Sequence, residues 1–437
     1  MLEDRGFVEA RPQSGYYVRP RPRVLREPAT TRPPAAPQFV GVTQLVTDII
    51  RAARDPKIVP LGAGVPAADL FPTSKLQRLL SSVSRRRTRL LGHYSLAPAN
   101  AELQRELSRR SLDWSGGLAP EEFVVTNGCM EALNLCLRAV TKPGDTVAIE
   151  SPAYFGVLQA IESLGVKALE IPTSPRDGIS LEALAMALDT RRIKACIAVT
   201  TVNNPLGSVM PDARKEQLVA MLADAGVPLI EDEVYADLAF SEPRPAPAKR
   251  YDRTGNVMLC SSFTKVLAPG FRIGWVAPGR FRPQVELLKF INSVATTEFL
   301  QVTIAEFLRD GGFDQHLRRL RRVFHDNLAA CTAAIEQSFP AGTGVTRPQG
   351  GFLLWVELPA AVDALELHAQ ALANGIAIAP GPMFSATGRY RNCLRLSCGH
   401  PWSKELESAL LRLGELATAL AASGTSSTAL VKSRSRE

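Results

Sequence analysis

The chain has 437 residues, of which 46 % are hydrophobic, and its formal net charge is +8. This length suits two or three domains or subdomains with a sizeable core, and no apolar run reaches the length of a membrane span or of a signal peptide. The seven cysteines contain no CxxC pair and the five histidines lack metal-ligand spacing, so reduced thiols, a cytoplasmic location and no metal site are expected.

The N-terminal part of the chain differs in composition from the rest. Residues 1–19 pass from a short helical end to two short runs, FVEA and YYV, which predict a β-hairpin around the turn PQSG. Residues 20–42 form a linker rich in proline and arginine, and its first part, up to Pro37, is expected to lack packed structure. The globular part extends from about 43 to 423, and the polar tail 424–437 is expected to be disordered.

Short apolar strands alternate with helical patterns in the globular part. Continuous apolar strands separated by helices indicate an α/β fold with a mainly parallel sheet covered by helices on both faces. The predicted strands are DTVAIE (145–150), IKACIAVTT (193–201), VPLIED (227–232), NVMLCSS (256–262) and FRIGWVA (271–277), with EFVVTNG (122–128) leading into a helix at 129–140; LEALAMAL (181–188) and RKEQLVAMLADAG (214–226) predict further helices.

Polar residues follow several of these strands at the edge where ligands bind in such sheets. Gly128, Cys129 and Met130 open a helix, whose free N–H groups favour a phosphate. Arg272 could hold the same phosphate with two hydrogen bonds, and Ser262 could add a hydroxyl. Asp232 ends an apolar strand and should face a cation, and Lys265 could form an imine with an aldehyde. Pyridoxal phosphate carries all of the groups that these residues would bind.

Nine motifs strengthen this interpretation, and they occur in a fixed order over about 340 residues. Together they resemble the fold-type I aminotransferases, and within them the MocR subfamily of GntR regulators. The resemblance implies a pyridoxal-phosphate-binding large domain at 93–300 and a smaller α+β domain at 301–423, with 43–92 as the N-terminal part of the small domain and the entry to the large domain. The motifs are GAGVPAADLFP (62–72), TNGCMEAL (126–133), ESPAYFG (150–156), NNPLG (203–207), EDEVYADL (231–238), SSFTKVLAPGFRIGW (261–275), PQGGFLLWVELP (348–359), GIAIAPGPMF (375–384) and LRLSCG (394–399).

The resemblance also implies a role for each site residue. Lys265 would carry the cofactor and move a proton, Asp232 would hold the pyridine nitrogen protonated, and Arg395, aided by the backbone near Gly64, would bind the substrate carboxylate. Tyr94 would reach the phosphate of a neighbouring subunit, which implies a homodimer with shared sites. The remaining roles are the phenolic oxygen for Asn204 and Tyr235, ring stacking for Tyr154, and the phosphate for Gly128, Cys129, Met130, Ser262 and Arg272.

Less specific explanations remain open for several of these residues. Asp232 could be a strand-end cap, Tyr154 and Tyr235 plain core aromatics, and Arg395 a structural ion-pair partner. The pocket for the substrate side chain has no recognisable motif, and its lining is expected on loops such as 38–45 and 280–300.

The sequence leaves three functions open. The first is a transcriptional regulator whose aminotransferase-like body senses pyridoxal phosphate or an amino-acid aldimine. The second is a working aminotransferase that moves an amino group between an L-amino acid and a 2-oxo acid. A cofactor-binding scaffold without turnover is the third. Residues 1–19 resemble the end of a GntR winged helix, with the recognition helix largely missing, so DNA binding is expected only if that module is restored.

DNA binding by these 437 residues should therefore be weak, nonspecific and steeply dependent on salt. The arginines near the hairpin, among them Arg5, Arg11 and Arg19, can meet phosphates but cannot distinguish base sequences. Gel-shift titrations on a specific upstream region and on random DNA should give equal affinities at physiological salt. A clear preference for one sequence would show that the DNA-reading element lies elsewhere in the chain.

Overall fold

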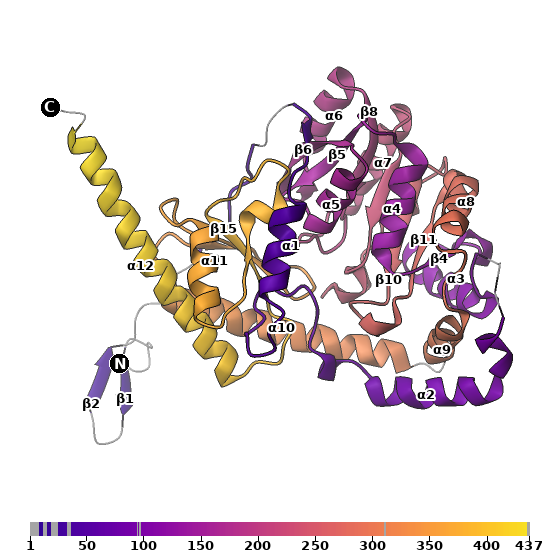
Figure 1. The fold of residues 1–437 in the computed structure, drawn as a ribbon, viewed down its shortest axis with the longest axis horizontal. Helices are drawn as coiled ribbons and strands as arrows, with labels where there is room; N and C mark the ends of the chain where they lie inside the picture. The colour runs from indigo at the N-terminus through magenta and orange to yellow at the C-terminus, as the bar shows by residue number, and fades with distance from the viewer. Residues whose placement is uncertain are drawn as a thin grey trace.

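The computed structural model describes residues 8–11, 15–18, 25–32, 36–93, 95, 98–309 and 312–434. Its largest element is a nine-stranded sheet, in the right-hand half of Figure 1, that carries most of the predicted strands. From one edge to the other the strands are β3 (Gln38–Phe39), β6 (Lys167–Ser174), β5 (Thr146–Ser151), β8 (Ile193–Ala198), β9 (Leu229–Asp232), β10 (Val257–Ser262), β11 (Gly274–Ala277) and β4 (Val124–Thr126), and β7 (Gly178–Ile179) pairs with β6.

The sheet is mixed, with the predicted parallel strands at its centre and antiparallel strands toward its edges. The five central strands β6, β5, β8, β9 and β10 are all parallel, as expected from the helices that separate them. β11 runs antiparallel to both β10 and β4 because only a short loop separates it from β10, and β3 and β7 also pair antiparallel with β6. The parallel strands place their carboxyl ends at one edge, which is where the predicted site residues lie.

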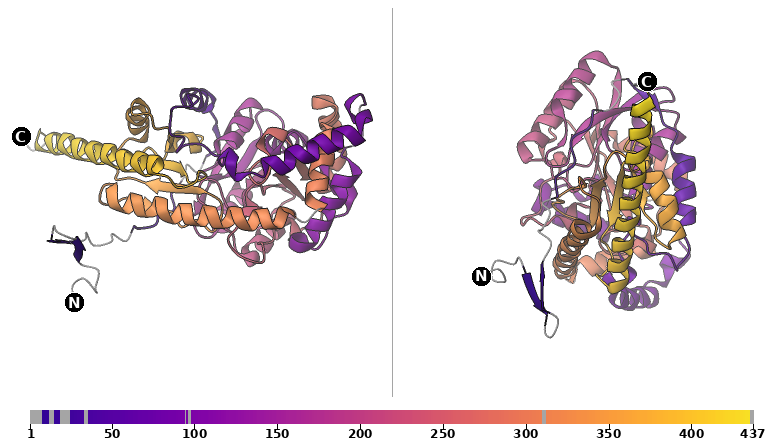
Figure 2. Two further views of the ribbon diagram at one scale, coloured as in Figure 1. Left: turned by 90° about the horizontal axis from the view of Figure 1, so that it is seen from below. Right: turned by 90° about the vertical axis from the view of Figure 1, so that its left-hand side faces the viewer.

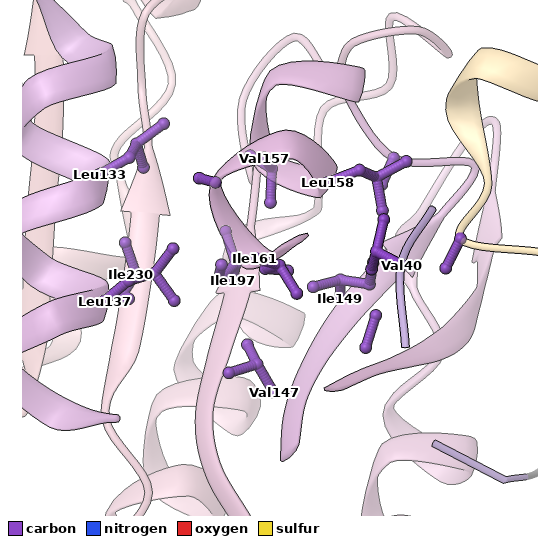
Figure 3. Close-up of a cluster of buried hydrophobic side chains, with 14 of the residues drawn as sticks. Val40, Leu133, Leu137, Val147, Ile149, Val157, Leu158, Ile161, Ile197 and Ile230 are labelled. Atoms are coloured by element: carbon purple, nitrogen blue, oxygen red, sulfur yellow. The ribbon is translucent and has the colours of Figure 1, made fainter. Parts of the chain in front are cut away.

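Helices cover both faces of this sheet, because strand residues that alternate in sequence are buried on opposite sides. Figure 3 shows part of one layer, in which Ile149 and Ile197 of the strands face Ile161 of α5. α1 (Thr43–Ala52), α4 (Cys129–Val140), α5 (Phe155–Ser163) and α8 (Arg282–Ser293) contribute to this layer, α6 (Leu181–Thr190) and α7 (Asp212–Asp224) cover part of the other face, and α2 (Thr73–Arg86), α3 (Ala101–Ser115) and α9 (Glu298–Arg309) cover the rest.

A smaller antiparallel sheet forms the second domain. Its strands occur in the order β12 (Gly344–Val345), β13 (Leu353–Glu357), β15 (Cys393–Ser397) and β14 (Ala379–Pro380), and it packs against α11 (Ala364–Ala373) and α12 (Lys404–Arg434). The α+β character of this domain agrees with the prediction.

The long helix α10 (Gly312–Ser338) joins the two domains, and Figure 2 shows it running beside both. Its first half buries Leu317 and Phe324 in the core of the large domain, and its second half buries Leu328 and Ile335 in the core of the small domain. α10 therefore packs in both cores, and the expected domain boundary at residue 300 stays a prediction.

Residues 25–32 of the linker contact both domains, which corrects for this part the prediction of an unpacked segment. Arg26 pairs with Glu357 of the small domain at 2.9 Å, and Glu27 forms an ion pair with Arg176 of the large domain. The Thr31 hydroxyl lies 2.8 Å from the Tyr390 hydroxyl, and Pro28 is buried. We call residues 25–32 the strap, because they bridge both domains.

The two ends of the chain differ in how they match the predictions. β1 (Val8–Arg11) and β2 (Gly15–Val18) form the expected hairpin, which lies apart from both sheets in Figure 1. The predicted disordered tail differs from the structure, where α12 continues to Arg434.

No helix in the described ranges is both long and apolar enough to cross a membrane. Short 3₁₀ helices occupy Ala68–Leu70, Thr88–Leu91, Pro120–Glu122, Ala236–Leu238, Ala248–Tyr251, Pro269–Phe271, Gly279–Phe281 and Gly381–Phe384.

Candidate active site

The predicted residues from the large sheet surround one cavity of about 290 Å³ at the carboxyl edge of its parallel strands. A second cavity of about 430 Å³ adjoins it and shares Tyr154, Asn204, Tyr235 and Lys265 with it. The sequence-predicted residues that line the first cavity are Cys129, Met130, Tyr154, Asn204, Asp232, Tyr235, Ser262, Lys265 and Arg272; Gly64 and Arg395 line the second.

Lys265 lies between these two cavities, three residues beyond the end of β10. Its Nζ donates a hydrogen bond of 2.6 Å to the carbonyl oxygen of Gly64. Burial, followed by the nearby positive charge of Arg395, lowers the pKa of Lys265 to about 8. A substantial fraction of the side chain is therefore the neutral amine near physiological pH, which is the form that attacks an aldehyde.

Asp232 ends β9 and is 4 % exposed. Burial raises the pKa of its carboxyl to about 6, although hydrogen bonds to the carboxylate counteract this effect. Its Oδ1 accepts the backbone N–H of Val234 at 3.0 Å and the thiol of Cys129 at 3.5 Å. The thiol contact was missed from the sequence, where Cys129 was considered only as a backbone donor. Both bonds hold Oδ1, which fixes the orientation of the carboxylate toward the cavity.

The residues at the expected phosphate site fit the phosphate group of pyridoxal phosphate. Two glycines keep this loop free of side chains that would clash with their neighbours. Gly128 has φ of +83°, and a Cβ there would lie 2.2 Å from Nη2 of Arg272. Gly274, which was not among the predicted site residues, packs against Gly128. A Cβ on Gly274 would lie 2.5 Å from the Gly128 carbonyl carbon. The guanidinium of Arg272 is oriented by Thr264 Oγ1 at 3.2 Å, and it lies beside the free N–H groups at the start of α4.

A buried ion pair between Glu131 and Lys289 stabilises the turn at Asn127 and Gly128 that precedes α4. Sequence analysis also missed this pair. Glu131 accepts the backbone N–H of Asn127 at 2.6 Å, and Lys289 of α8 donates to the same carboxylate at 2.8 Å. Lys289 is 4 % exposed, so each charge depends on the other for stabilisation. A lysine on the inner face of an otherwise amphipathic helix is the signal that could have indicated this pair.

Arg395 comes from β15 of the small domain and is 1 % exposed. Nη1 donates to Asn204 Oδ1 at 3.1 Å and Nη2 donates to the carbonyl oxygen of Gly62 at 2.9 Å. Within the described residues Nε has no hydrogen-bond partner and no carboxylate pairs with the guanidinium. A buried cation without an anion is costly, so the explanation as a structural ion pair is not supported, whereas a carboxylate ligand fits.

The two tyrosines of the site are held within the cavity walls. Burial raises the pKa of Tyr154 to about 12 and also raises that of Tyr235, so both phenols stay protonated as donors. The centroid of the Tyr235 ring lies 5.8 Å from the Lys265 Nζ. Tyr94, the predicted contact to a neighbouring subunit, lies outside the described residues.

The lining of the second cavity differs from the expectation of loops 38–45 and 280–300. α1 and the residue after it contribute Ile49, Ile50 and Ala53, and the segments 60–65 and 377–383 supply most of the rest. These segments are distant in sequence, and a backbone bridge between Val59 and Ile376, with the Ala377 N–H donating to the Val59 carbonyl oxygen at 3.0 Å, brings them together. No cluster of metal-ligating side chains occurs among the described residues.

Comparison with known proteins shows the family. Residues 56–413 match the family Aminotransferase class I and II. The chain belongs to the class I and II aminotransferases. Two proteins from Escherichia coli (strain K12), named as the uncharacterized HTH-type transcriptional regulators YdcR and YjiR, are each 40 % identical to the chain. Each match covers 95 % of this chain, with 89 % of YdcR and 88 % of YjiR.

Among solved aminotransferase structures, LysN of Thermus thermophilus superposes with a TM-score of 0.80. It is 28 % identical, and the match covers 86 % of this chain and 95 % of LysN. That structure is an alpha-aminoadipate aminotransferase complexed with N-(5'-phosphopyridoxyl)-L-leucine. Family membership and this relative's ligand indicate pyridoxal phosphate as the cofactor of this aminotransferase-like chain, in agreement with the sequence prediction and the cavity.

The pKa of Lys265 predicts how cofactor attachment depends on pH. Only the neutral amine reacts, so the rate of attachment to cofactor-free protein should rise about tenfold per pH unit up to about pH 8, then level off. Stopped-flow absorbance after addition of pyridoxal phosphate measures this rate. A free lysine analogue in solution is the control, and a protein rate that still rises tenfold per unit above about pH 9 would contradict the lowered pKa.

The close packing of Gly274 predicts a defect in phosphate binding. In Gly274→Ala the new Cβ meets backbone atoms of Gly128 and Cys129 at 2.5–2.8 Å, which no rotamer change relieves. Overpacking of this kind costs about 1–3 kcal/mol, so affinity for pyridoxal phosphate should fall at least about fivefold in absorbance titrations. Gly270→Ala is the matched control, because a Cβ there meets nothing within 4 Å and should leave the affinity unchanged.

Proposed function

We propose that the chain is a pyridoxal-phosphate-binding regulator of the MocR/GntR type, whose aminotransferase-like body senses the cofactor or its adduct with an amino acid. The similarity to two HTH-type regulators over 95 % of the chain carries this proposal. The cavity supports it, because the residues that the cofactor needs come together there.

Each residue of the site has a defined task toward the cofactor. Lys265 is the point of covalent attachment. Its amine, whose pKa is lowered to about 8, moves a proton on the side of the cavity that faces the amino acid. Asp232 binds the ring nitrogen, and Arg272 binds the phosphate together with N–H groups at the start of α4. Arg395 binds the carboxylate of the amino acid. When bound, pyridoxal phosphate supplies an electron sink for the amino-acid Cα.

The second candidate function is amino-group transfer between an L-amino acid and a 2-oxo acid. The observation that favours it is Lys265, whose lowered pKa and position between the two cavities suit it to repeated proton transfer. The same residues would serve a sensor and an enzyme, so turnover distinguishes the two functions.

The strap offers a physical route from the ligand to the N-terminal part of the chain. Arg26 is tied to Glu357 of the small domain, while Glu27 is tied to Arg176 of the large domain. A ligand held by both Lys265 and Arg395 also bridges the two domains. A change in the separation of the two domains would therefore act on the strap and on the segment that precedes it.

We also propose that the chain forms a homodimer. α8 exposes Leu287, Phe290 and Ile291, which are between 51 % and 64 % exposed. An apolar cavity of about 780 Å³ between α2 and the segment 267–271 adjoins the site at Val65. Exposed apolar surface of this extent is typical of protein interfaces.

Lys265→Ala tests the sensing function. It should abolish the visible absorption of the covalently attached cofactor and its trapping by borohydride, while the phosphate contacts still retain the cofactor noncovalently. In cells, transcripts that change on deletion of the gene should be restored by the intact gene and not by the same gene carrying Lys265→Ala. Unchanged transcripts on deletion, together with many turnovers on an amino acid and a 2-oxo acid, would favour the aminotransferase.

A further inference from the structure

The second cavity has an unusual distribution of charge. Most of its wall is apolar, with Ile49 and Ile50 on one side and Ile378 and Met383 on another. The residues that line it include the cations Lys265, Arg395 and Arg54, and they include no aspartate or glutamate. A ligand that carries negative charge at separated points, joined by an apolar chain, complements such a wall.

Two of these three cations already have tasks in the proposed function. Lys265 reacts with the cofactor and faces the amino group, and Arg395 binds the carboxylate next to it. Arg54 remains, and it lies just after α1, on the same side of the cavity as Ile50 and Ala53. It is exposed, so it can reorient toward a ligand without the cost of breaking a buried contact.

Arg54 also differs from Arg51, which lies in the last turn of α1. Arg51 pairs with Asp48, with Nη1 3.5 Å from Oδ1. The side chain of Arg54 has neither an ion pair nor a hydrogen bond to any other residue that the structure describes. Its guanidinium is therefore available to bind a carboxylate with two hydrogen bonds.

We propose that Arg54 recognises a second, terminal carboxylate, and that the ligand is an amino dicarboxylic acid or the corresponding 2-oxo acid. This inference rests on the proposed function, because it assigns the α-carboxylate to Arg395. The apolar wall between the two arginines accommodates the methylene chain of such a ligand. A basic side chain would be disfavoured, since the cavity offers it two arginines and no acidic partner.

Amino-acid titrations of the cofactor-loaded protein test the proposal, with the visible absorption of the bound cofactor as the readout. The probes are L-aspartate, L-glutamate and L-2-aminoadipate, compared with L-norvaline, L-norleucine and L-lysine. At least one dicarboxylate should bind about tenfold or more tightly than the monocarboxylates. Arg54→Gln should remove this preference while leaving L-norleucine binding unchanged, and Arg51→Gln, the matched control, should retain it.

A charge reversal at the same position adds a positive test. Arg54→Glu should weaken dicarboxylate binding further and raise the relative affinity for L-lysine. If none of the three dicarboxylates binds more tightly than L-norvaline and L-norleucine in the unaltered protein, or if the preference is unchanged in Arg54→Gln, the role of Arg54 is overturned while the proposed sensing function stands. If no amino acid changes the absorption of a protein that has bound the cofactor, the proposed amino-acid ligand is wrong as well.

Discussion

The contact between Arg395 and Asn204 is the interaction on which the arrangement of the site depends. It joins the small sheet to the loop after β8 of the large sheet, and the same guanidinium also binds the carbonyl oxygen of Gly62. Three segments far apart in the sequence therefore meet at one buried cation. The positive charge contributes to the lowered pKa of Lys265, so the contact that closes the cavity also adjusts its reactive amine.

Two elements that contact both domains hold the two sheets in position relative to each other. α10 buries one half in each core, which makes it a stiff connection. The strap is a lighter connection on a different part of the surface, made of ion pairs and of the hydroxyl contact between Thr31 and Tyr390. Exposed ion pairs contribute little to stability, so the strap can yield while α10 stays intact. This difference suits a segment that reports on the ligand.

Tyr390 connects the strap to the interior of the molecule. Its hydroxyl lies 2.7 Å from Ser151 Oγ, and Ser151 in turn donates to Glu170. Ser151 ends β5, three residues before Tyr154 at the cofactor cavity. Hydrogen bonds through Tyr390 and Ser151, followed by three residues of backbone, thus connect the strap to the cavity. The same connection would serve a regulator, and it would not hinder an enzyme.

By itself, the sequence determined the local elements and supplied the candidate site residues. The helix at 129–140 has the predicted bounds, and Asp232 and Lys265 lie at strand ends as expected, because apolar runs and glycine turns are encoded within a few residues. Tertiary structure alone decided the direction of β11, the docking of the strap, the thiol contact of Cys129 to Asp232 and the position of Arg54 at the second cavity. Each of these depends on side chains or strands that meet across long separations in sequence, and no local pattern specifies such a meeting.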